Sequence, residues 1–264
     1  MNTWHSLKSA LGQLTRLADE LPKSIKQLQE TLVNDWIGQV VKSDAPTQDA
    51  VGRLLGWAVE HRGPSLSAES KREFDELFEK VPQESRRYAG DFLDIMIRSD
   101  EYNVFVRNMS LVYIVTLYEN YVQSVLEISF NNWPSSLGKD KSISFEQLNK
   151  CRDISEARRL VVSRAASEIM HEGIEDVDVF IEKRWGVKMS SSPEWIDFVE
   201  RFYRRNIIIH NNGMPNDIYK SRTGYTGPDE RLDVSSDYLK ATIELFGKTG
   251  ERLFNEFNAK LKAQ

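Results

Sequence analysis

The sequence is poor in cysteine, glycine and proline and has no long hydrophobic run, and each shortage excludes a class of protein. Its single cysteine, Cys151, cannot form an internal disulfide, which indicates a reducing compartment. The 14 glycines and 8 prolines are too few for a collagen-like or low-complexity chain. The longest apolar stretch, around 111–118, is much shorter than the roughly 20 residues of a membrane span. We therefore expect a globular protein with no membrane-spanning segment.

Signals for secretion, metal binding and nucleotide binding are also missing. Residues 1–5 lack the basic and then apolar segment of a secretory signal, so we predict a cytoplasmic protein. Four scattered histidines and one cysteine are unsuited to a closed structural zinc site. Neither a P-loop nor a dinucleotide-binding glycine motif occurs, and His171 has no second histidine at metalloprotease spacing. We predict no metal and no cofactor.

The charge balance restricts how the protein could bind nucleic acid. Acidic residues outnumber basic ones by 40 to 35, which gives a net charge of −5 at neutral pH. Affinity for nucleic acid regardless of sequence comes from Lys and Arg side chains that neutralise phosphates. The chain is therefore no general nucleic-acid binder, and any such role must be concentrated in one local site.

Hydrophobic residues recur at helical spacing through almost the whole chain, and no useful stretch alternates with period two. This pattern predicts an all-α protein: a helical bundle over 100–264 and an accessory helical region over 1–99. The accessory region is either a scaffold, which we favour, or a surface for a partner or a sensor. The predicted helices cover 2–20, 22–42, 51–59, 67–80, 82–98, 103–131, 144–150, 154–171, 175–185, about 193–211 and 236–262, with a polar loop over 216–234.

One predicted helix, which follows the helix-start signal of 190–194, carries an unusual mixture of apolar and polar residues. On a helical wheel its apolar residues form one face, and Arg201 and Arg204 fall on the opposite side, where we expect solvent. The apolar face consists of Trp195, Phe198, Val199, Phe202 and Ile209. Ile207 and Ile208 lie off this face, so the C-terminal half of the helix is apolar nearly all round, and such a helix is buried on more than one side.

Three polar residues interrupt this helix. Asn206 and His210 are four residues apart and share a stripe inside the apolar face, and Arg205 lies at its edge. Burying an unpaired amide, imidazole or guanidinium costs several kcal/mol, on the order of 2–7 for an amide or hydroxyl. The three groups therefore need a polar network, a partner chain or a substrate pocket. A buried, hydrogen-bonded His–Asn pair is the structural alternative, and we favour a functional site.

The segment Arg205-Asn206-x-x-x-His210 resembles the signature of HEPN domains, an all-helical family whose motif is Arg, a polar residue, a few further positions and His. The following Asn-Asn-Gly of 211–213 and the downstream Tyr219 are similar to bacterial members. The long preceding helix also carries a Glu within an apolar run, Glu119 in 117–121. The resemblance extends over about 103–262, and residues before 100 have no match that we can name.

The resemblance implies a metal-independent endoribonuclease that acts as a homodimer. In the family the motif helices of two protomers meet, and Arg and His line a composite cleft. By this resemblance His210 transfers a proton, Arg205 holds the scissile phosphate, and the 2′-OH of the RNA attacks it to leave a 2′,3′-cyclic phosphate. Asn206 would orient His210 or the phosphate, and Glu119 would tether Arg205 or His210.

Further basic residues follow the motif helix and are candidates to bind the RNA backbone. These are Lys220, Arg222 and Arg231, and the resemblance adds Asn211, although a solvated loop is the default interpretation for the basic ones. By contrast, we expect a solvent-exposed helix face to carry Arg158, Arg159 and Arg164.

Two functions from different classes remain open. The first is an RNA endonuclease of the toxin or antiviral type, restrained until it is triggered. The second is a catalytically silent HEPN-type module in which the helical region senses a ligand or assembles with a partner protein. The intact Arg-Asn…His motif favours the first, and the acidic charge favours the second.

Overall fold

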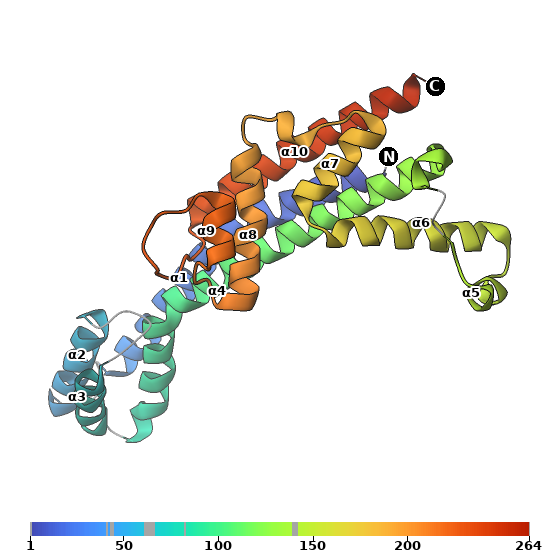
Figure 1. Ribbon diagram of the computed structural model, residues 1–264. Coiled ribbons are helices and arrows are strands. Elements are labelled where there is room, and N and C mark those ends of the chain that lie inside the picture. The colour runs from blue at the N-terminus through green and yellow to red at the C-terminus, as the bar shows by residue number, and fades with distance from the viewer. Residues whose placement is uncertain are drawn as a thin grey trace. The chain divides into compact units, whose positions relative to one another are not determined.

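A computed structural model of the protein describes residues 2–40, 42, 45–60, 67–81, 83–138 and 142–263. Within these residues the chain is helical and contains no strand, so the predicted all-α class is confirmed. The helices are α1 Asn2–Val40, α2 Ala45–Glu60, α3 Ala68–Glu79, α4 Gln83–Asn132, α5 Phe145–Lys150, α6 Ile154–His171, α7 Ile174–Trp185, α8 Trp195–Asn211, α9 Asp217–Thr223 and α10 Ser236–Lys262, with short 3-10 turns at Pro134–Leu137 and Met189–Ser191 (Figure 1).

Three predicted boundaries were wrong. The helix α1 continues through Pro22, where we expected a new helix to begin. The helix α4 is continuous from 83 to 132, because the expected break at 99–102 contains neither Gly nor Pro to stop it. The segment 216–234 is not all loop: the Asn216 side chain accepts a hydrogen bond from the Tyr219 N–H at 2.8 Å and caps the short helix α9.

The helices divide into two compact units. Unit 1 comprises Met1–Thr15 and Asn108–Gln264, and unit 2 comprises Arg16–Arg107. Both α1 and α4 contribute residues to both units. The predicted boundary at 99/100 lies close to the end of unit 2, but residues 2–15, which we placed in the accessory region, pack with unit 1.

Unit 2 has a small hydrophobic core between α2 and α3. The Trp57 ring packs on Phe74, with ring centroids 5.2 Å apart, and Phe74 stacks on Phe78 at 5.5 Å. The Trp57 indole N–H donates to a Glu73 carboxylate oxygen at 3.2 Å, which satisfies its only polar atom. Leu54 of α2 is completely buried.

Unit 1 is organised around an aromatic cluster that joins α4, α8 and α10. The Tyr118 ring of α4 makes edge contacts with Phe198 and Phe202 of α8 and with Phe246 of α10, at centroid distances of 5.1, 6.4 and 5.0 Å. Such pairs add about 0.5–1.5 kcal/mol each beyond the area they bury. These contacts fix where α8 lies along α4.

The start of α1 completes this core. It runs beside α4 and α10 (Figure 1), and the Trp4 ring contacts Tyr121 and Phe254 at 6.1 and 6.4 Å. The Tyr121 hydroxyl donates to the Gly250 carbonyl oxygen at 3.0 Å. Gly250 has no side chain, and a Cβ there would lie 2.7 Å from a Trp4 ring carbon and 3.1 Å from a Leu7 methyl carbon. Gly250 therefore allows α1 to approach α10 closely.

We predict that Gly250→Ala lowers the free energy of unfolding by about 1–3 kcal/mol, because the rigid Trp4 ring must move away. The matched control is Gly247→Ala on the same helix, where an added Cβ meets no atom within 4 Å. The control should be neutral or stabilising by up to about 1 kcal/mol, since Ala favours helix over Gly. Equal effects of the two substitutions in denaturant unfolding would contradict this packing.

Candidate functional site

The motif helix α8 ends as its sequence predicts. Asn212 adopts a left-handed conformation with φ of 50°, and Gly213 follows with φ of 79°. The Gly213 N–H donates to the Ile207 carbonyl oxygen at 2.9 Å, which satisfies an otherwise unpaired carbonyl at the helix end. The beginning differs slightly, because Glu194 occupies the N-cap position and makes no side-chain capping bond.

Different sides of α8 are buried in its two halves. The helical wheel did not predict which residues of the second half are buried. In the first half Phe198, Val199 and Phe202 are buried as expected. In the second half Ile207, expected off the apolar face, is only 2% exposed, and Ile209, expected on it, is 46% exposed. The reason is that α9 packs against α8, so α8 is covered on a second side.

Asn206 and His210 were predicted to lie inside the apolar face, and this was wrong. Both side chains are exposed, on the stripe that also carries Ile209. Neither makes a hydrogen bond to the part of the chain that the structure describes. The alternative of a buried, hydrogen-bonded His–Asn pair therefore does not occur in a single chain. The two polar groups face outward, one helical turn apart.

Of the two partners that we considered for Glu119, Arg205 and His210, the structure shows Arg205. Its guanidinium Nη2 donates to the Glu119 Oε1 of α4, and the Arg205 side chain is 19% exposed. Burial raises the pKa of the Glu119 carboxyl above its ordinary value, while the adjacent Arg205 charge acts in the opposite direction. The Arg205 Nε is buried and has no hydrogen-bond partner among the residues that the structure describes.

Arg201 and Arg204, expected in solvent, are nearly buried in a network around Glu200. Their side chains are 12% and 13% exposed. One Glu200 oxygen accepts from Arg204 at 3.0 Å and from the Tyr219 hydroxyl at 2.6 Å, and the other accepts from Arg201 at 3.0 Å and from the Tyr238 hydroxyl at 2.6 Å. Both guanidinium groups also lie over the Tyr238 ring. The network connects α8 to α9 and α10.

A cleft of about 440 Å³ lies beside the motif. Glu119 of α4 and Arg205 and Asn206 of α8 line it, together with Arg222 of α9. The cleft thus brings together four of the residues that the sequence singled out. His210 does not line it. His171, at the end of α6, lines the cleft, although we considered this residue only as a metal ligand.

A second set of polar contacts lies in the same cleft. The Tyr203 hydroxyl donates to a Glu175 carboxylate oxygen at 2.5 Å, and the Arg222 guanidinium lies 3.8 Å from that oxygen. Burial, followed by the bond to Glu175, raises the pKa of Tyr203 to about 12. Both arginines of the cleft are therefore paired with carboxylates: Arg205 with Glu119, and Arg222 with Glu175.

The remaining predicted RNA contacts have structural partners. Lys220 pairs with Asp229 at 2.6 Å, and Arg231 pairs with Asp233 at 2.7 Å. The Asn211 side chain donates to the Met214 carbonyl oxygen at 2.7 Å and shapes the turn after α8.

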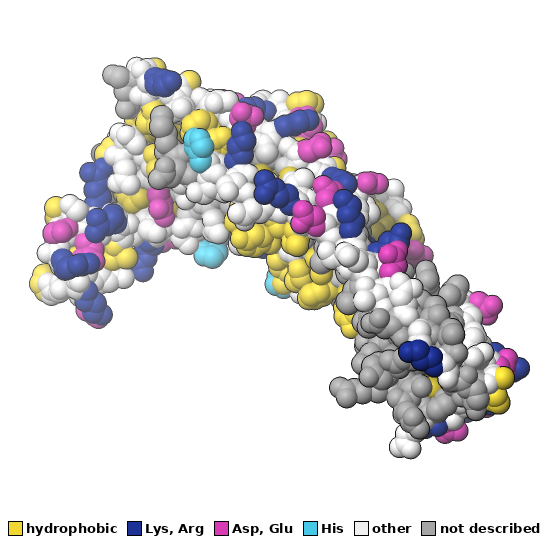
Figure 2. Space-filling model, turned by 180° about the vertical axis from the view of Figure 1, so that it is seen from behind, with side chains coloured by type: hydrophobic (Ala, Val, Ile, Leu, Met, Phe, Trp, Pro, Cys, Tyr) yellow, Lys and Arg dark blue, Asp and Glu magenta, His cyan; other side chains and the backbone are white. Residues whose placement is uncertain are grey.

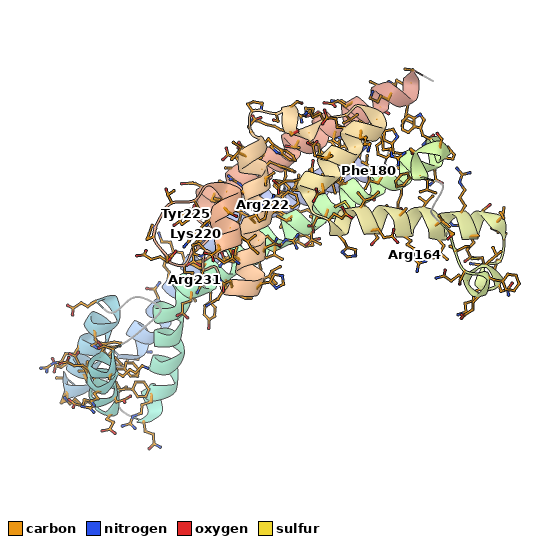
Figure 3. The ribbon with its side chains drawn as sticks, in the orientation of Figure 1. Arg164, Phe180, Lys220, Arg222, Tyr225 and Arg231 are labelled. Carbon is orange, nitrogen blue, oxygen red and sulfur yellow. The ribbon has the colours of Figure 1, made fainter. Side chains whose placement is uncertain are left out.

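The loop that carries Arg231 is held against the end of the motif helix. The Leu232 N–H donates to the Gly213 carbonyl oxygen at 2.9 Å. A Cβ on Gly213 would lie 3.1 Å from the Arg231 Cγ, so that side chain passes directly over the turn. Figure 3 shows Arg231, Lys220 and Arg222 in the region of α8 and α9, and Arg164 apart from them on α6. Arg231 therefore lies next to the end of the helix that bears His210.

The arginines of α6 match the expectation of a solvated face. Arg158, Arg159 and Arg164 are all exposed. Arg158 donates to the Asn131 carbonyl oxygen at 3.0 Å, and Arg164 donates to the Gln147 side chain at 3.4 Å. None of the three lines the cleft beside the motif.

Exposed hydrophobic side chains accompany the motif. Unit 1 exposes Met109 and Tyr113 on α4 as well as Ile209 on α8. Figure 2 shows a patch of hydrophobic side chains with a histidine at its edge.

Among the described residues, no group of three or more His, Cys, Asp or Glu side chains is placed to hold a metal ion. No helix in the described part of the chain combines the length and apolar character needed to cross a membrane.

Comparisons with protein-family models, with curated proteins and with solved structures find no significant match to the chain. The resemblance to HEPN domains therefore rests on the residues of α4 and α8 themselves.

We predict that Glu200→Gln destabilises the protein by about 3 kcal/mol, because two nearly buried guanidinium groups lose their counter-charge. The matched control is Glu182→Gln, which removes a carboxylate from an exposed ion pair with Lys188. Exposed pairs contribute about 0–1 kcal/mol, so the control should unfold almost like the wild type. A Glu200→Gln variant as stable as the control in urea unfolding would show that the network does not hold α8 in place.

Proposed function

We propose that the protein is a metal-independent endoribonuclease with its site on α8 at Arg205, Asn206 and His210. The strongest support is the arrangement of these side chains. Arg205 and Asn206 line a cleft, and His210 lies one turn beyond Asn206 on the same exposed stripe, without an intramolecular partner among the described residues. A polar stripe that packing does not use is available to a substrate.

The proposed reaction needs a phosphate-binding cation and a proton-transfer group. Arg205 can bind a phosphodiester through two parallel N–H donors and stabilise the charge that develops on its oxygens. The His210 imidazole can accept the 2′-OH proton at neutral pH. The 2′ oxygen then attacks phosphorus, the bond to O5′ breaks, and the products end in a 2′,3′-cyclic phosphate and a 5′-OH. Glu119 acts as a positioning residue, because it holds the Arg205 guanidinium.

We propose that a second copy of the chain packs on Ile209 of α8. Ile209 is a large hydrophobic residue exposed between the two polar groups Asn206 and His210. A two-fold contact centred on Ile209 would bury that side chain in both copies and bring two motifs together, with Asn206 and His210 at the edge of the contact and open to a substrate. The resemblance to HEPN domains implies the same assembly.

The state of the arginines fits an effector that is restrained until triggered, of the toxin or antiviral kind. Arg205 and Arg222 are each paired with a carboxylate of the cleft. An RNA phosphate must therefore compete with Glu119 and Glu175 for the two guanidinium groups. A trigger, a second protomer or a regulatory protein that shifts these carboxylates would activate the site.

The catalytically silent binding module remains the second candidate, because one observation favours it. In a single chain His210 does not line the cleft that contains Arg205. If no assembly brings the His210 imidazole to that cleft, the cleft binds an anionic ligand without cleaving it.

We predict that Arg205→Ala and His210→Ala each reduce cleavage of total cellular RNA in EDTA by at least about 100-fold, since each removes a group that acts in the transition state. Asn206→Ala should reduce cleavage less. Circular dichroism of both variants should match that of the wild type, because His210 is exposed and Arg205 lines the cleft at the edge of the core. The control is Arg159→Ala, which removes an exposed arginine of α6 outside the cleft.

Cleavage that persists in His210→Ala, or that stops when EDTA is added to the wild type, would refute this mechanism. If the wild type binds RNA but cuts none in the presence of any trigger, the binding module is the correct function.

We predict that Ile209→Glu converts a dimer to a monomer, because it places two charges in the proposed two-fold contact. Light scattering at micromolar concentration should give the mass of two chains for the wild type and of one chain for the variant. Ile196→Glu is the control, since Ile196 is also exposed on α8 but lies near its other end. A monomeric wild type, or a dimer that Ile209→Glu leaves intact, would contradict assembly through the motif helix.

A further inference from the structure

The cleft beside the motif contains an imidazole that the motif does not include. His171 is the last residue of α6, and the turn that follows it passes into α7 through Gly173, which has a φ of 101°. This turn lies along the cleft that Arg205 and Asn206 line from α8. The His171 side chain is exposed and makes no hydrogen bond to the described part of the chain. It therefore needs no rearrangement to meet a bound ligand.

Cleavage by the 2′-OH requires two proton transfers, and these occur on opposite sides of phosphorus. The 2′ oxygen must lose its proton as it attacks, and the departing O5′ must gain one as its bond to phosphorus breaks. The attacking and leaving oxygens lie roughly in line, so one side chain cannot contact both at the same moment. A site with a single imidazole leaves one of the two transfers to water. The second group must come from a different element.

We propose that His171 is a catalytic residue that donates a proton to the leaving O5′, while His210 accepts the proton of the attacking 2′-OH. The inference rests on the proposed ribonuclease function and adds a residue outside the motif. After the reaction His171 is neutral and His210 carries the proton, so solvent exchange restores the starting state. Arg205, which is on the same helix as His210 and lines the cleft together with His171, holds the phosphate.

Carboxylates predominate among the charged groups that line the cleft with His171. Four carboxylates line the cleft, from three elements: Glu119 on α4, Glu172 after α6, and Glu175 and Asp176 on α7. The other ionisable groups that face it are Tyr203 and Arg205 on α8 and Arg222 on α9. Glu119 and Glu175 are already engaged by the arginines, whereas Glu172 and Asp176 have no ion-pair partner among the described residues.

A leaving-group substitution tests this role directly. The substrate is a synthetic RNA that the wild type cuts at one mapped bond, made either with the natural O5′ or with sulfur in its place. A thiolate leaves without a proton, so it has no need of an acid. We expect His171→Ala to cut the oxygen substrate at least about 100-fold more slowly than the wild type, and to cut the sulfur substrate within about tenfold of the wild type. His210→Ala should be slow on both.

His5→Ala, which removes an exposed imidazole of α1 outside the cleft, is the control and should cut both substrates like the wild type. Loss of a merely structural residue would slow both substrates equally, so an equal loss in His171→Ala overturns the proposal. Normal cleavage of the oxygen substrate by His171→Ala overturns it as well and leaves the ribonuclease function intact. If the wild type cuts no RNA, the proposed function fails first, and the role of His171 fails with it.

Discussion

The aromatic cluster of Tyr118, Phe198, Phe202 and Phe246 is the contact on which the candidate site depends. Glu119 follows Tyr118 directly on α4, and Arg205 comes three residues after Phe202 on α8. When the four rings pack, the neighbouring residue on α4 and the next turn of α8 bring the carboxylate and the guanidinium together. The ion pair is therefore a consequence of the core. A change in ring packing would move the two charged groups apart without touching either of them.

The Glu200 network holds a second side of α8 in place. Together with the aromatic cluster, it determines which side chains of α8 remain exposed. The aromatic cluster covers one side of the first half of α8. The bonds from Glu200, Tyr219 and Tyr238 hold α9 and α10 against another. What is left exposed in the second half is a stripe of Asn206, Ile209 and His210. The polar motif is thus accessible because the other sides of this half of α8, those of Arg204, Arg205 and Ile207, are used in packing.

The sequence alone predicted the helical class, the bounds of α6 and α10, the closure of α8 and the contact between Arg205 and Glu119. These depend on local spacing or on a resemblance in residue pattern. It could not predict that Arg204 is buried, because Tyr219 and Tyr238, which surround it, lie 15 and 34 residues further along the chain. The apolar C-terminal half of α8 indicated burial on more than one side, but it could not show that Ile207 would be buried while Ile209 stays exposed. His171 was missed because its approach to Arg205 follows from the packing of α7 on α8, which no local pattern encodes.

The chemistry of the RNA ends tests the central claim, that Arg205 and His210 cut RNA through its own 2′-OH, most directly. Mass spectrometry of the upstream fragment from a synthetic RNA distinguishes the possible products. We predict a 2′,3′-cyclic phosphate, one water lighter than a linear phosphate, with a 5′-OH on the downstream fragment. A 3′-OH on the upstream fragment and a 5′-phosphate on the downstream one would mean that water was the nucleophile, and would contradict the account.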